Sequence, residues 1–434
     1  LDPCCGTGNF LLQLPDVLPF DSIYGNDIDA ASVKITRLNM ALKYNVPVAA
    51  IYEHITGQDY LTDYAEKDFQ YIIGNPPWGY DFSEEEKSHL RTIYKSATGK
   101  NIESYDVFIE QALNHLTDNG HLAYVLPEAI LNVKAHTNIR KTILENCSIK
   151  NLVFLGNAFD GVQCPCIILD LQCTRSPLST VGMNVNTGTA SFTINIERTV
   201  SAEYFSFTTS DAEYNVLCKI RSMPNSAYLL DNADFALGIV TGNNKEYISD
   251  IKNENNEMIL KGADICKYHI TRTNNYIVFK PENFQQAAPT EMYRSPEKLL
   301  YRFISSQLVF AYDDKQTLSL NSCNIVIPRL PGIKIKYVLA ILNSRIAQFI
   351  YKKEFNSVKV LRSHIENIPI PTADASTQAE IIALTDKLIS GLQAAEAEKV
   401  YDELDLLVSK AFNLDSNEIE IINKAVEGDN KFLA

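Results

Sequence analysis

Short apolar runs alternate with longer amphipathic stretches over the first 170 residues. Runs of this kind, rich in β-branched and aromatic residues and bounded by turn residues, are typical of buried strands. Helical periodicity predicts helices over 30–44 and 105–118, the second ending at Asn119-Gly120. Strands are predicted at 22–28, 69–74, 121–127, 152–156 and 166–172. This alternation predicts an α/β fold, with a parallel or mixed sheet covered by helices on both faces.

The pattern changes near 173–182 (CTRSPLSTVG), where Thr, Ser and Pro replace the apolar runs. Short β runs broken by Asn and Gly follow over about 235–330, and then a predicted helix over 334–351. A capping-box spacing at Thr377 and Glu380 predicts the start of a long helix toward residue 411. We therefore predict a first domain over 1–175, a mixed α+β domain over 180–371 and a C-terminal helical segment over 372–434.

Composition adds that the chain is globular. Its 434 residues exceed one ordinary domain, and 46% apolar with 10% aromatic residues is typical of a soluble α/β protein. The sequence shows neither an apolar run of the roughly 18–20 residues that a membrane helix needs nor a basic-then-apolar signal sequence, so we expect the cytoplasm.

The cysteine spacing and the net charge narrow the possible classes of function. The nine cysteines are scattered without the paired spacing of a zinc site, so we interpret them as reduced packing residues and expect no metal. The net charge of −14 argues against nucleic-acid binding by bulk electrostatics. Any affinity for DNA must come from local patches of Lys and Arg.

The opening DPCCGTGNFL places Gly6 and Gly8 in a tight loop before a helix that begins near Asn9 or Phe10. Glycines there allow the backbone to approach a ligand closely. Short Gly-x-Gly turns also occur in α/β proteins that bind no ligand, so this loop alone is a weak signal.

Two acidic residues strengthen the interpretation of the glycine loop as part of a nucleotide site. Asp27 ends a predicted strand nineteen residues after Gly8, where a doubly wound fold presents a carboxylate to ribose hydroxyls. Asp29 is the competing candidate, and a turn or helix-cap role is the alternative for Asp27. Asp59, in GQDYL, is a candidate acceptor for the adenine amine of a cofactor, or an ordinary loop aspartate.

The most informative motif is IIGNPPWGY, in which a predicted strand delivers Asn75, Pro76, Pro77 and Trp78 to its C-terminal end. Open α/β sheets bind ligands at that edge. The two prolines fix φ and have no N–H donor, so the loop is stiff and rich in acceptors.

Such a loop suits a planar amine. The lone pair of an adenine N6 amine is delocalised, and two acceptors, the Asn75 side-chain oxygen and the Pro76 carbonyl, would localise it for attack on a methyl group. Trp78 offers a flat face for a base extracted from a duplex. The alternative for Trp78 is a turn residue whose indole anchors the core.

In this order the motifs resemble the gamma-class N6-adenine DNA methyltransferases, particularly the TaqI-type enzymes with a C-terminal specificity domain. DPCCGTGNFL resembles their cofactor motif, GNDID their ribose-binding motif, GQDYL their adenine-contacting motif and NPPW their catalytic motif, where Tyr or Phe is commoner than Trp. The resemblance implies a Rossmann-like doubly wound methyltransferase sheet and S-adenosylmethionine as cofactor. It implies cofactor contacts from Asp2, Pro3, Gly6, Gly8, Asp27 and Asp59, and catalytic roles for Asn75, Pro76, Pro77 and Trp78.

Later segments extend the resemblance. GKNIESYDVFIEQAL places Asn101 and Phe108 near the cofactor and the sheet. LVFLGNAFDGVQCPCIILDL resembles the motif whose Phe packs on the flipped base, so Phe159 would complete an aromatic clamp with Trp78, or else be a core residue. GIVTGNN, LKGADICKY, KLLYRF before NIVIP, and LAILNSRIAQFIYKK before IENIPIP resemble the target-recognition domain.

Basic residues with interleaved aromatics in this second domain are the candidate phosphate contacts. The strongest candidates are Lys267, Arg272, Lys352, Lys353, Lys359 and Arg362, and Lys261, Arg294, Lys298 and Arg302 lie in the same stretches. For any single one, the alternative is a solvated surface residue.

The resemblance implies double-stranded DNA as partner, and a restriction endonuclease domain or subunit as a further one. The family carries another cofactor-pocket motif and most of the first strand upstream of the glycine loop, and this chain starts after both, so we expect it to be N-terminally truncated. Two other hypotheses stay open: a methyltransferase of RNA or of a protein amide, and a DNA-recognition fragment of a restriction or phage-defence assembly without catalysis.

Overall fold

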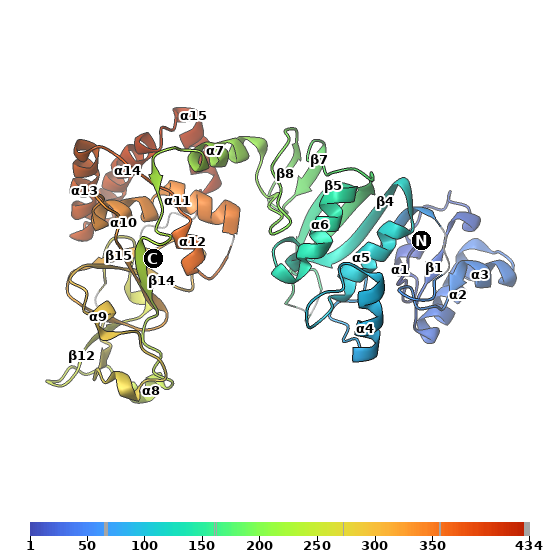
Figure 1. The fold of residues 1–434 in the computed structure, drawn as a ribbon, viewed down its shortest axis with the longest axis horizontal. Coiled ribbons are helices and arrows are strands. Elements are labelled where there is room, and N and C mark those ends of the chain that lie inside the picture. The colour runs from blue at the N-terminus through green and yellow to red at the C-terminus, as the bar shows by residue number, and fades with distance from the viewer. Residues whose placement is uncertain (65–67, 160, 162, 272, 356, 429–434) are drawn as a thin grey trace. The chain divides into compact units, whose positions relative to one another are not determined.

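A computed structural model describes residues 1–64, 68–159, 161, 163–271, 273–355 and 357–428. The chain forms two compact units, Leu1–Asp211 and Ala212–Ala434 (Figure 1). Within the described ranges, none of the helices combines the length and apolar character needed to span a membrane.

The first unit is built on a sheet of six strands in its described part, in the order β3-β4-β6-β5-β7-β8. Their bounds are β3 Phe69–Gly74, β4 Leu116–Pro127, β5 Cys147–Gly156, β6 Cys166–Cys173, β7 Met183–Asn186 and β8 Ser191–Ile194. β3 and β4 are parallel, whereas β6 runs antiparallel to both β4 and β5. The sheet is therefore mixed, and the strands predicted at 69–74, 121–127, 152–156 and 166–172 are confirmed within it.

A second, two-stranded parallel sheet joins β1 (Gly25–Asn26) to β2 (Ile55–Thr56). Leu1 and Asp2 form the seam between the two sheets. On one side Asp2 N donates to Tyr24 O at 3.0 Å, and on the other Ile73 N donates to Leu1 O at 2.9 Å. The two sheets therefore form one continuous surface with their strand ends at a common edge.

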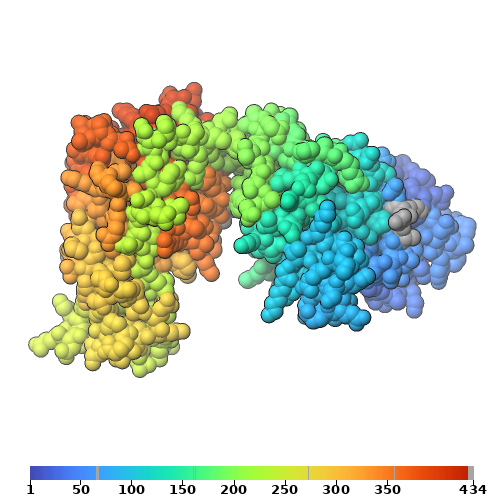
Figure 2. Space-filling model, in the orientation of Figure 1, coloured from blue at the N-terminus to red at the C-terminus, as the bar shows by residue number. Residues whose placement is uncertain are grey.

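Helices flank these strands in chain order. Helix α2 (Ala30–Tyr44) has the predicted bounds, and Asp29 caps it by accepting from the backbone N–H groups of Ala31 and Ser32. Helix α5 (Ser104–Asn114) is shorter than predicted, because Leu116 already pairs with Phe69 in the β3–β4 ladder. α6 (Thr137–Asn146) follows, and the short α1 and α3 span Asn9–Leu12 and Val48–His54. α4 (Glu84–Ile93) protrudes at the surface of the unit (Figure 2).

The core of the first unit lies between the main sheet and helices α5 and α6. Alternate residues of β4, namely Leu122, Tyr124 and Leu126, are buried on this side, as the two-residue repeat of a strand requires.

The end of the first unit lies beyond the predicted boundary. β7 pairs parallel with β5, and β8 pairs antiparallel with β7, so both extend the main sheet. The boundary predicted at 175–180 therefore falls inside this unit, whose last residue is Asp211.

The described part of the second unit has a helical layer and two four-stranded sheets. One sheet has the order β10-β17-β14-β15, and the other has the order β11-β13-β12-β16. In β14, Leu299 and Tyr301 face the helical core, whereas Leu300 packs in the cluster between the sheets. Strand bounds are β10 Ala233–Ala236, β11 Ile248–Ser249, β12 Glu257–Leu260, β13 Tyr276–Ile277, β14 Lys298–Arg302, β15 Phe310–Asp313, β16 Leu318–Ser319 and β17 Cys323–Pro328.

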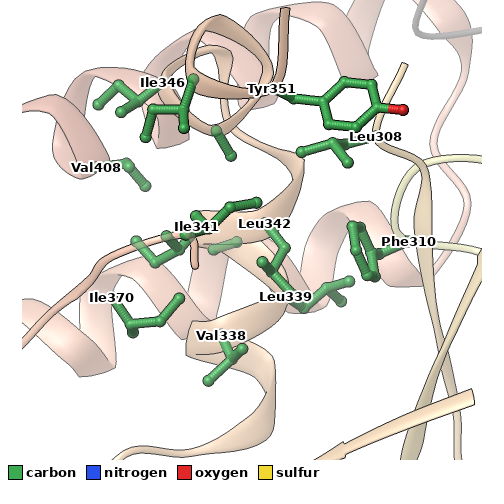
Figure 3. Close-up of a cluster of buried hydrophobic side chains, with 14 of the residues drawn as sticks. Leu308, Phe310, Val338, Leu339, Ile341, Leu342, Ile346, Tyr351, Ile370 and Val408 are labelled. Carbon is green, nitrogen blue, oxygen red and sulfur yellow. The ribbon is translucent and has the colours of Figure 1, made fainter. Parts of the chain in front are cut away.

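The C-terminal helices belong to this unit. The predicted segment 372–434 contains α13 (Ala375–Ile389), α14 (Ala394–Ala411) and α15 (Ser416–Ala425), and its first helix is capped by Asp374 rather than Thr377. These helices share one core with α10 (Ile335–Asn343) and α11 (Arg345–Ile350). Figure 3 shows part of it, where Leu339 and Leu342 of α10 lie near Phe310 of β15. The segment is therefore packed as part of the second unit.

The remaining elements are short or connect the others. They are β9 Ser226–Ala227 paired with β18 Ile370–Pro371, α7 Asp211–Arg221, α8 Asn244–Tyr247, α9 Thr290–Tyr293 and α12 Arg362–Glu366.

Candidate functional site

A cavity of about 290 Å³ opens at the carboxyl ends of the parallel strands of the first unit. Pro3 follows the seam, Asp27 follows β1, Asp59 follows β2 and Asn75 follows β3, so the seam and these three strands each contribute a residue. Ligands of open α/β sheets bind at this edge. The other lining residues are Cys4, Asn26, Ile28, Gln58, Tyr60, Leu61, Thr62, Pro77, Tyr80, Phe82, Glu86, His89, Leu90 and Phe108.

The glycine loop is fastened to Asp27 and α2. Gly6 N donates to Asp27 Oδ2 at 2.8 Å, and the Thr36 hydroxyl donates to Gly6 O at 2.7 Å. Gly8 has φ of 88°, and a Cβ there would lie 3.1 Å from Thr36 Cγ2. Gly8 therefore serves close packing on α2, and among the described residues the cavity lining includes neither Gly6 nor Gly8.

The structure separates the two acidic candidates after β1. Asp27 lines the cavity and accepts from Gly6 N and Asp29 N. Asp29 is exposed and caps α2, and the hydrogen bonds from Ser32 and Ala31 hold the pKa of Asp29 below its usual range. Of the two carboxylates, Asp27 is the one that faces the cavity.

Asn26 organises the cavity and was not a candidate from the sequence. Its fully buried side-chain amide donates to Pro3 O at 3.3 Å and to Gln58 O at 2.9 Å. Its side-chain oxygen accepts from Thr56 Oγ1 at 2.9 Å and from Gln58 N at 3.0 Å. A polar residue at the buried end of a strand, directly before Asp27, was the available signal.

Hydrogen bonds fix the loop that carries Asp59. Asp59 Oδ1 accepts from Leu61 N at 2.9 Å, and the Tyr94 hydroxyl donates to Leu61 O at 2.6 Å. Gln111 of α5 donates to Tyr60 O at 3.2 Å. These bonds keep the Asp59 side of the cavity in a fixed position.

Asp2 lies beneath the cavity rather than in its described lining. It is fully buried, and its Oδ1 accepts from Cys4 N at 3.2 Å. Its Oδ2 is buried without a hydrogen-bond partner among the described residues. Burial raises the pKa of Asp2 to about 7.

The Asn-Pro-Pro-Trp loop leaves β3 at the rim of the cavity. Asn75 is exposed and lines the cavity together with the half-buried Pro77, whereas Pro76 is buried. Trp78 is half-buried against the core of the first unit, and Gly79 follows with φ of 64°. The loop therefore presents Asn75 to the opening.

The structure brings Trp78 and Phe159 together. Their ring centroids lie 5.5 Å apart at an interplanar angle of 76°, so they pack edge to face, and Phe159 is 40% exposed. A base stacked between two parallel rings needs roughly 7 Å, twice the ordinary contact distance of about 3.5 Å. One of the two rings must therefore move before both faces of a base are covered.

One face of α5 contributes three side chains to the site. Ser104 donates to Pro77 O at 2.5 Å, Phe108 lines the cavity, and Gln111 holds the Asp59 loop. Phe108 was predicted from the sequence, whereas Ser104 and Gln111 were not, although polar residues on a buried helix were a usable signal. Asn101 is exposed and is absent from the described lining.

Most of the basic candidates of the second unit do not face solvent freely. Lys267 was predicted to contact phosphate, but it is only 4% exposed. Its ammonium donates to Asn343 O at 3.0 Å and to Tyr401 Oη at 3.4 Å. An apolar neighbourhood and a helix end hold it inside the unit, so it is no surface contact. Lys353 pairs with Glu213 at 2.8 Å, and Lys352 is half-buried.

The same holds for the weaker candidates. Lys298 is fully buried in an ion pair with Asp313, Arg294 pairs with Glu257, Arg302 donates to Ile265 O, and Lys261 donates to Asn275. Arg272 lies outside the described residues.

Lys359 and Arg362 remain as surface candidates. Lys359 is exposed and pairs through its backbone with Ile304, which is 66% exposed. The Arg362 side chain is 59% exposed, pairs with Glu366 at 2.7 Å and lies over the Phe235 ring at 5.1 Å. Lys359 thus lies beside the exposed Ile304, and Arg362 lies beside the half-buried Phe235.

The α/β sheet, with a cavity at its strand ends and the Asn75 loop at the rim, gives the first unit a Rossmann-like fold. The whole-chain fold is similar to that of the type IIL restriction-modification enzyme MmeI, solved in complex with DNA. The TM-score is 0.59 at 12% identity, over 99% of this chain and 72% of that one.

Residues 1–197 match the family model described as N-6 DNA Methylase, and residues 257–370 match the TaqI-like C-terminal specificity domain. The first unit is therefore similar to the N-6 DNA methylase family, and part of the second unit is similar to the TaqI-like specificity domain. The resemblance stated from the sequence motifs is thereby confirmed.

Two curated relatives illustrate the range of the family. The type II methyltransferase M.VspI of Vibrio sp. (strain 343) is 31% identical over 271 residues, 61% of this chain and 64% of that protein. The putative type II restriction enzyme and methyltransferase RM.MjaORFECS2P of Methanocaldococcus jannaschii is 24% identical over 307 residues, 66% of this chain and 25% of that protein. The chain thus spans less than two thirds of the length of either relative.

Proposed function

We propose that the chain is the catalytic and specificity part of a restriction-modification DNA methyltransferase that transfers a methyl group to the N6 amine of adenine. The observation that carries this proposal is the position of Asn75, at the rim of a cavity that also contains Asp27 and Asp59. A donor in the cavity and an amine at the rim would meet beside one loop.

The residues of the cavity fit S-adenosylmethionine. Asp27 and Asp59 are acceptors for ribose hydroxyls and an adenine amine, because a carboxylate oxygen has lone pairs beyond the one its backbone donor uses. The cavity volume of about 290 Å³ is near the lower end of the usual range for small-molecule sites, roughly 300–1,000 Å³. When bound, this cofactor supplies an electrophilic methyl group on a sulfonium.

The chain itself supplies orientation. In the proposed mechanism the Asn75 side-chain oxygen and the Pro76 carbonyl each accept one N–H of the target amine, which turns its lone pair away from the ring. The prolines keep the two acceptors in place, since their φ is fixed. No strong base is required, because the proton leaves after the nitrogen has become positively charged.

The base must leave the duplex to reach this loop. Trp78 provides one stacking face, and Phe159 provides the second once the two rings separate, at a stacking contribution of about 1–3 kcal/mol per base. Lys359 and Arg362 are the proposed phosphate contacts of the specificity unit. An endonuclease, as a domain or a subunit, is the proposed partner in restriction.

The test is transfer of tritiated methyl groups from S-adenosylmethionine by the full chain and by Asn75→Ala. Duplex DNA, tRNA and protein compete as acceptors in the same assay. We expect transfer to duplex DNA, blocked when N6-methyladenine replaces adenine, and a loss of at least about 100-fold in Asn75→Ala. Asn417→Ala, an exposed change in α15, is the matched control.

Equal activity of the wild type and Asn75→Ala would remove Asn75 from the mechanism. Preference for tRNA or protein would assign the loop to another amine. Binding of DNA with no heat on addition of S-adenosylmethionine would identify a recognition module without catalysis.

A further inference from the structure

We infer that Ser104 is a positioning residue that fixes Trp78 by closing the turn Pro77-Trp78-Gly79-Tyr80. This inference rests on the proposed function, in which Trp78 receives the target base. Ser104 is the first residue of α5 and is fully buried.

The geometry is that of a β-turn bridged by a hydroxyl. Ser104 Oγ donates to Pro77 O at 2.5 Å and accepts from Tyr80 N at 3.4 Å. These are the carbonyl of the first and the N–H of the fourth turn residue, the two groups that a β-turn ordinarily joins directly. Gly79, the third residue, has a positive φ of 64°, which is the sign that a type II turn requires at that position.

The start of α5 is itself anchored, so Ser104 has a fixed base. The Tyr105 hydroxyl hydrogen-bonds to His136 Nε2 at 2.8 Å, and His136 Nδ1 hydrogen-bonds to the two Asp106 carboxylate oxygens at 2.9 and 3.0 Å. All three side chains are buried, and the Tyr105 ring stacks on His136. This network ties the first turn of α5 to the segment before α6.

Trp78 is the second residue of the turn, so its ring direction depends on the turn remaining closed. Its indole nitrogen is buried, and its ring contacts Phe159 at 5.5 Å between centroids. Without the Ser104 hydroxyl, both of the hydrogen bonds that join α5 to the turn are lost. The opened turn would expose the indole and misalign the stacking face.

The sequence offers an intrinsic probe, because Trp78 is the single tryptophan of the chain. The experiment compares fluorescence emission and acrylamide quenching of the full-length wild type, Ser104→Ala and the control Ser96→Ala. Ser96 is also buried in the first unit, but its hydroxyl has no hydrogen-bond partner among the described residues. We expect a red shift and stronger quenching in Ser104→Ala, and wild-type values in Ser96→Ala.

A pair of equal shape isolates the hydroxyl. Ser104→Thr keeps the oxygen and Ser104→Val removes it, while both add a methyl group. We expect Thr to restore wild-type emission and Val to resemble Ala. Equal emission of the Thr and Val variants, or wild-type emission of a folded Ser104→Ala, would overturn the assignment, since a purely structural serine would lower Tm without moving the fluorescence of Trp78. The Thr and Val comparison also decides the case if Ser104→Ala does not fold.

Methyl transfer gives the second readout. Removal of two hydrogen bonds that hold the reactive geometry should reduce kcat on the order of tenfold. The KM for S-adenosylmethionine should change less than kcat, because Ser104 itself does not belong to the described lining of the cavity and only the Pro77 and Tyr80 side of that lining depends on the turn. If the chain transfers no methyl group, the proposed function fails while the fluorescence result still decides the role of Ser104.

Discussion

Single buried polar residues decide the shape of the site. Asn26 connects the ends of three segments, and Asp106 anchors the start of α5. Buried polar groups must be hydrogen-bonded, and removing one partner leaves the others unpaired at about 1–3 kcal/mol each. Substitutions at such residues should therefore have effects beyond the side chain that is lost.

Asn26→Ala should weaken binding of S-adenosylmethionine without unfolding the chain. The change leaves Pro3 O and Gln58 O without their buried donor, so the loops on both sides of Asp27 lose their spacing. We expect an affinity loss on the order of tenfold, measured by calorimetry. Asn417→Ala, on the surface of the second unit, should bind as the wild type does, and unchanged affinity of Asn26→Ala would show that the loops hold themselves.

Asp106→Asn should change the pH dependence of stability in a defined direction. Burial raises the pKa of Asp106 to about 6, against the opposing hydrogen bond from His136. The folded state therefore binds the proton more tightly than the unfolded state, and ionisation costs the wild type stability as the pH rises from about 4 through 6. The Tm of Asp106→Asn relative to wild type should accordingly be more favourable at pH 8 than at pH 5.

The opposite trend is expected at Asp211. There burial, which raises the pKa, is outweighed by the Arg198 and Asn195 hydrogen bonds, so the pKa is lowered and the wild type gains stability above the unfolded pKa. The Tm of Asp211→Asn relative to wild type should thus worsen as the pH rises from 3 to 6. The same sign of slope in both variants would contradict this assignment.

At the scale of elements, β14 and β15 are joined by a charge pair as well as by their ladder. Lys298 and Asp313 are opposite each other in register, both fully buried, with 2.5 Å between ammonium and carboxylate. Asp313 also accepts from Thr317 N and Oγ1, so its remaining lone pairs are satisfied. Neither partner can be removed alone without leaving a buried charge.

Lys298→Met should destabilise the second unit by about 3–5 kcal/mol, because Asp313 is left uncompensated. The double change Lys298→Met with Asp313→Leu should cost much less than the single change, since both charges are gone. Urea unfolding followed by circular dichroism gives the two midpoints. A double variant less stable than Lys298→Met would contradict this expectation and show that Asp313 stabilises the unit mainly through its bonds to Thr317.

At the scale of the whole molecule, 53 acidic residues outnumber 39 Lys and Arg, and the resulting net charge of −14 opposes binding to a phosphate backbone. Burial removes Lys267 and Lys298 from the cations available to phosphate, and ion pairs engage Lys353 and Arg294. Binding of DNA should therefore depend on a small number of exposed residues, with Lys359 and Arg362 first among those described.

The salt dependence of DNA binding tests this count. A plot of log affinity against log salt concentration should lose about one unit of slope in Lys359→Ala and again in Arg362→Ala. Lys424→Ala, an exposed change in α15, should leave the slope unchanged. Slopes equal to the wild type in both test variants would place the phosphate contacts elsewhere.

The sequence predicted the parts of the site that are local and missed those that depend on packing. Asp27, Asn75 and Trp78 follow apolar runs directly, and strand ends are visible in a sequence. Ser104 lies about 27 residues beyond Pro77 and meets it only through the packing of α5, and nothing local to Lys267 showed that α14 would cover it. The boundary at 175–180 failed because β7 and β8 are short and polar on their open face, so they resembled a linker.

The seam formed by Leu1 and Asp2 has a consequence for how the two reactants are aligned. Strand β1, which precedes Asp27, is hydrogen-bonded to one edge of this dipeptide, and strand β3, which precedes Asn75, is hydrogen-bonded to the other edge. In the proposed mechanism, the cofactor side and the substrate side of the site are therefore joined by a segment of only two residues. A substitution that moves Leu1 or Asp2 would therefore change the distance over which the methyl group is transferred, without altering any side chain proposed to contact either reactant.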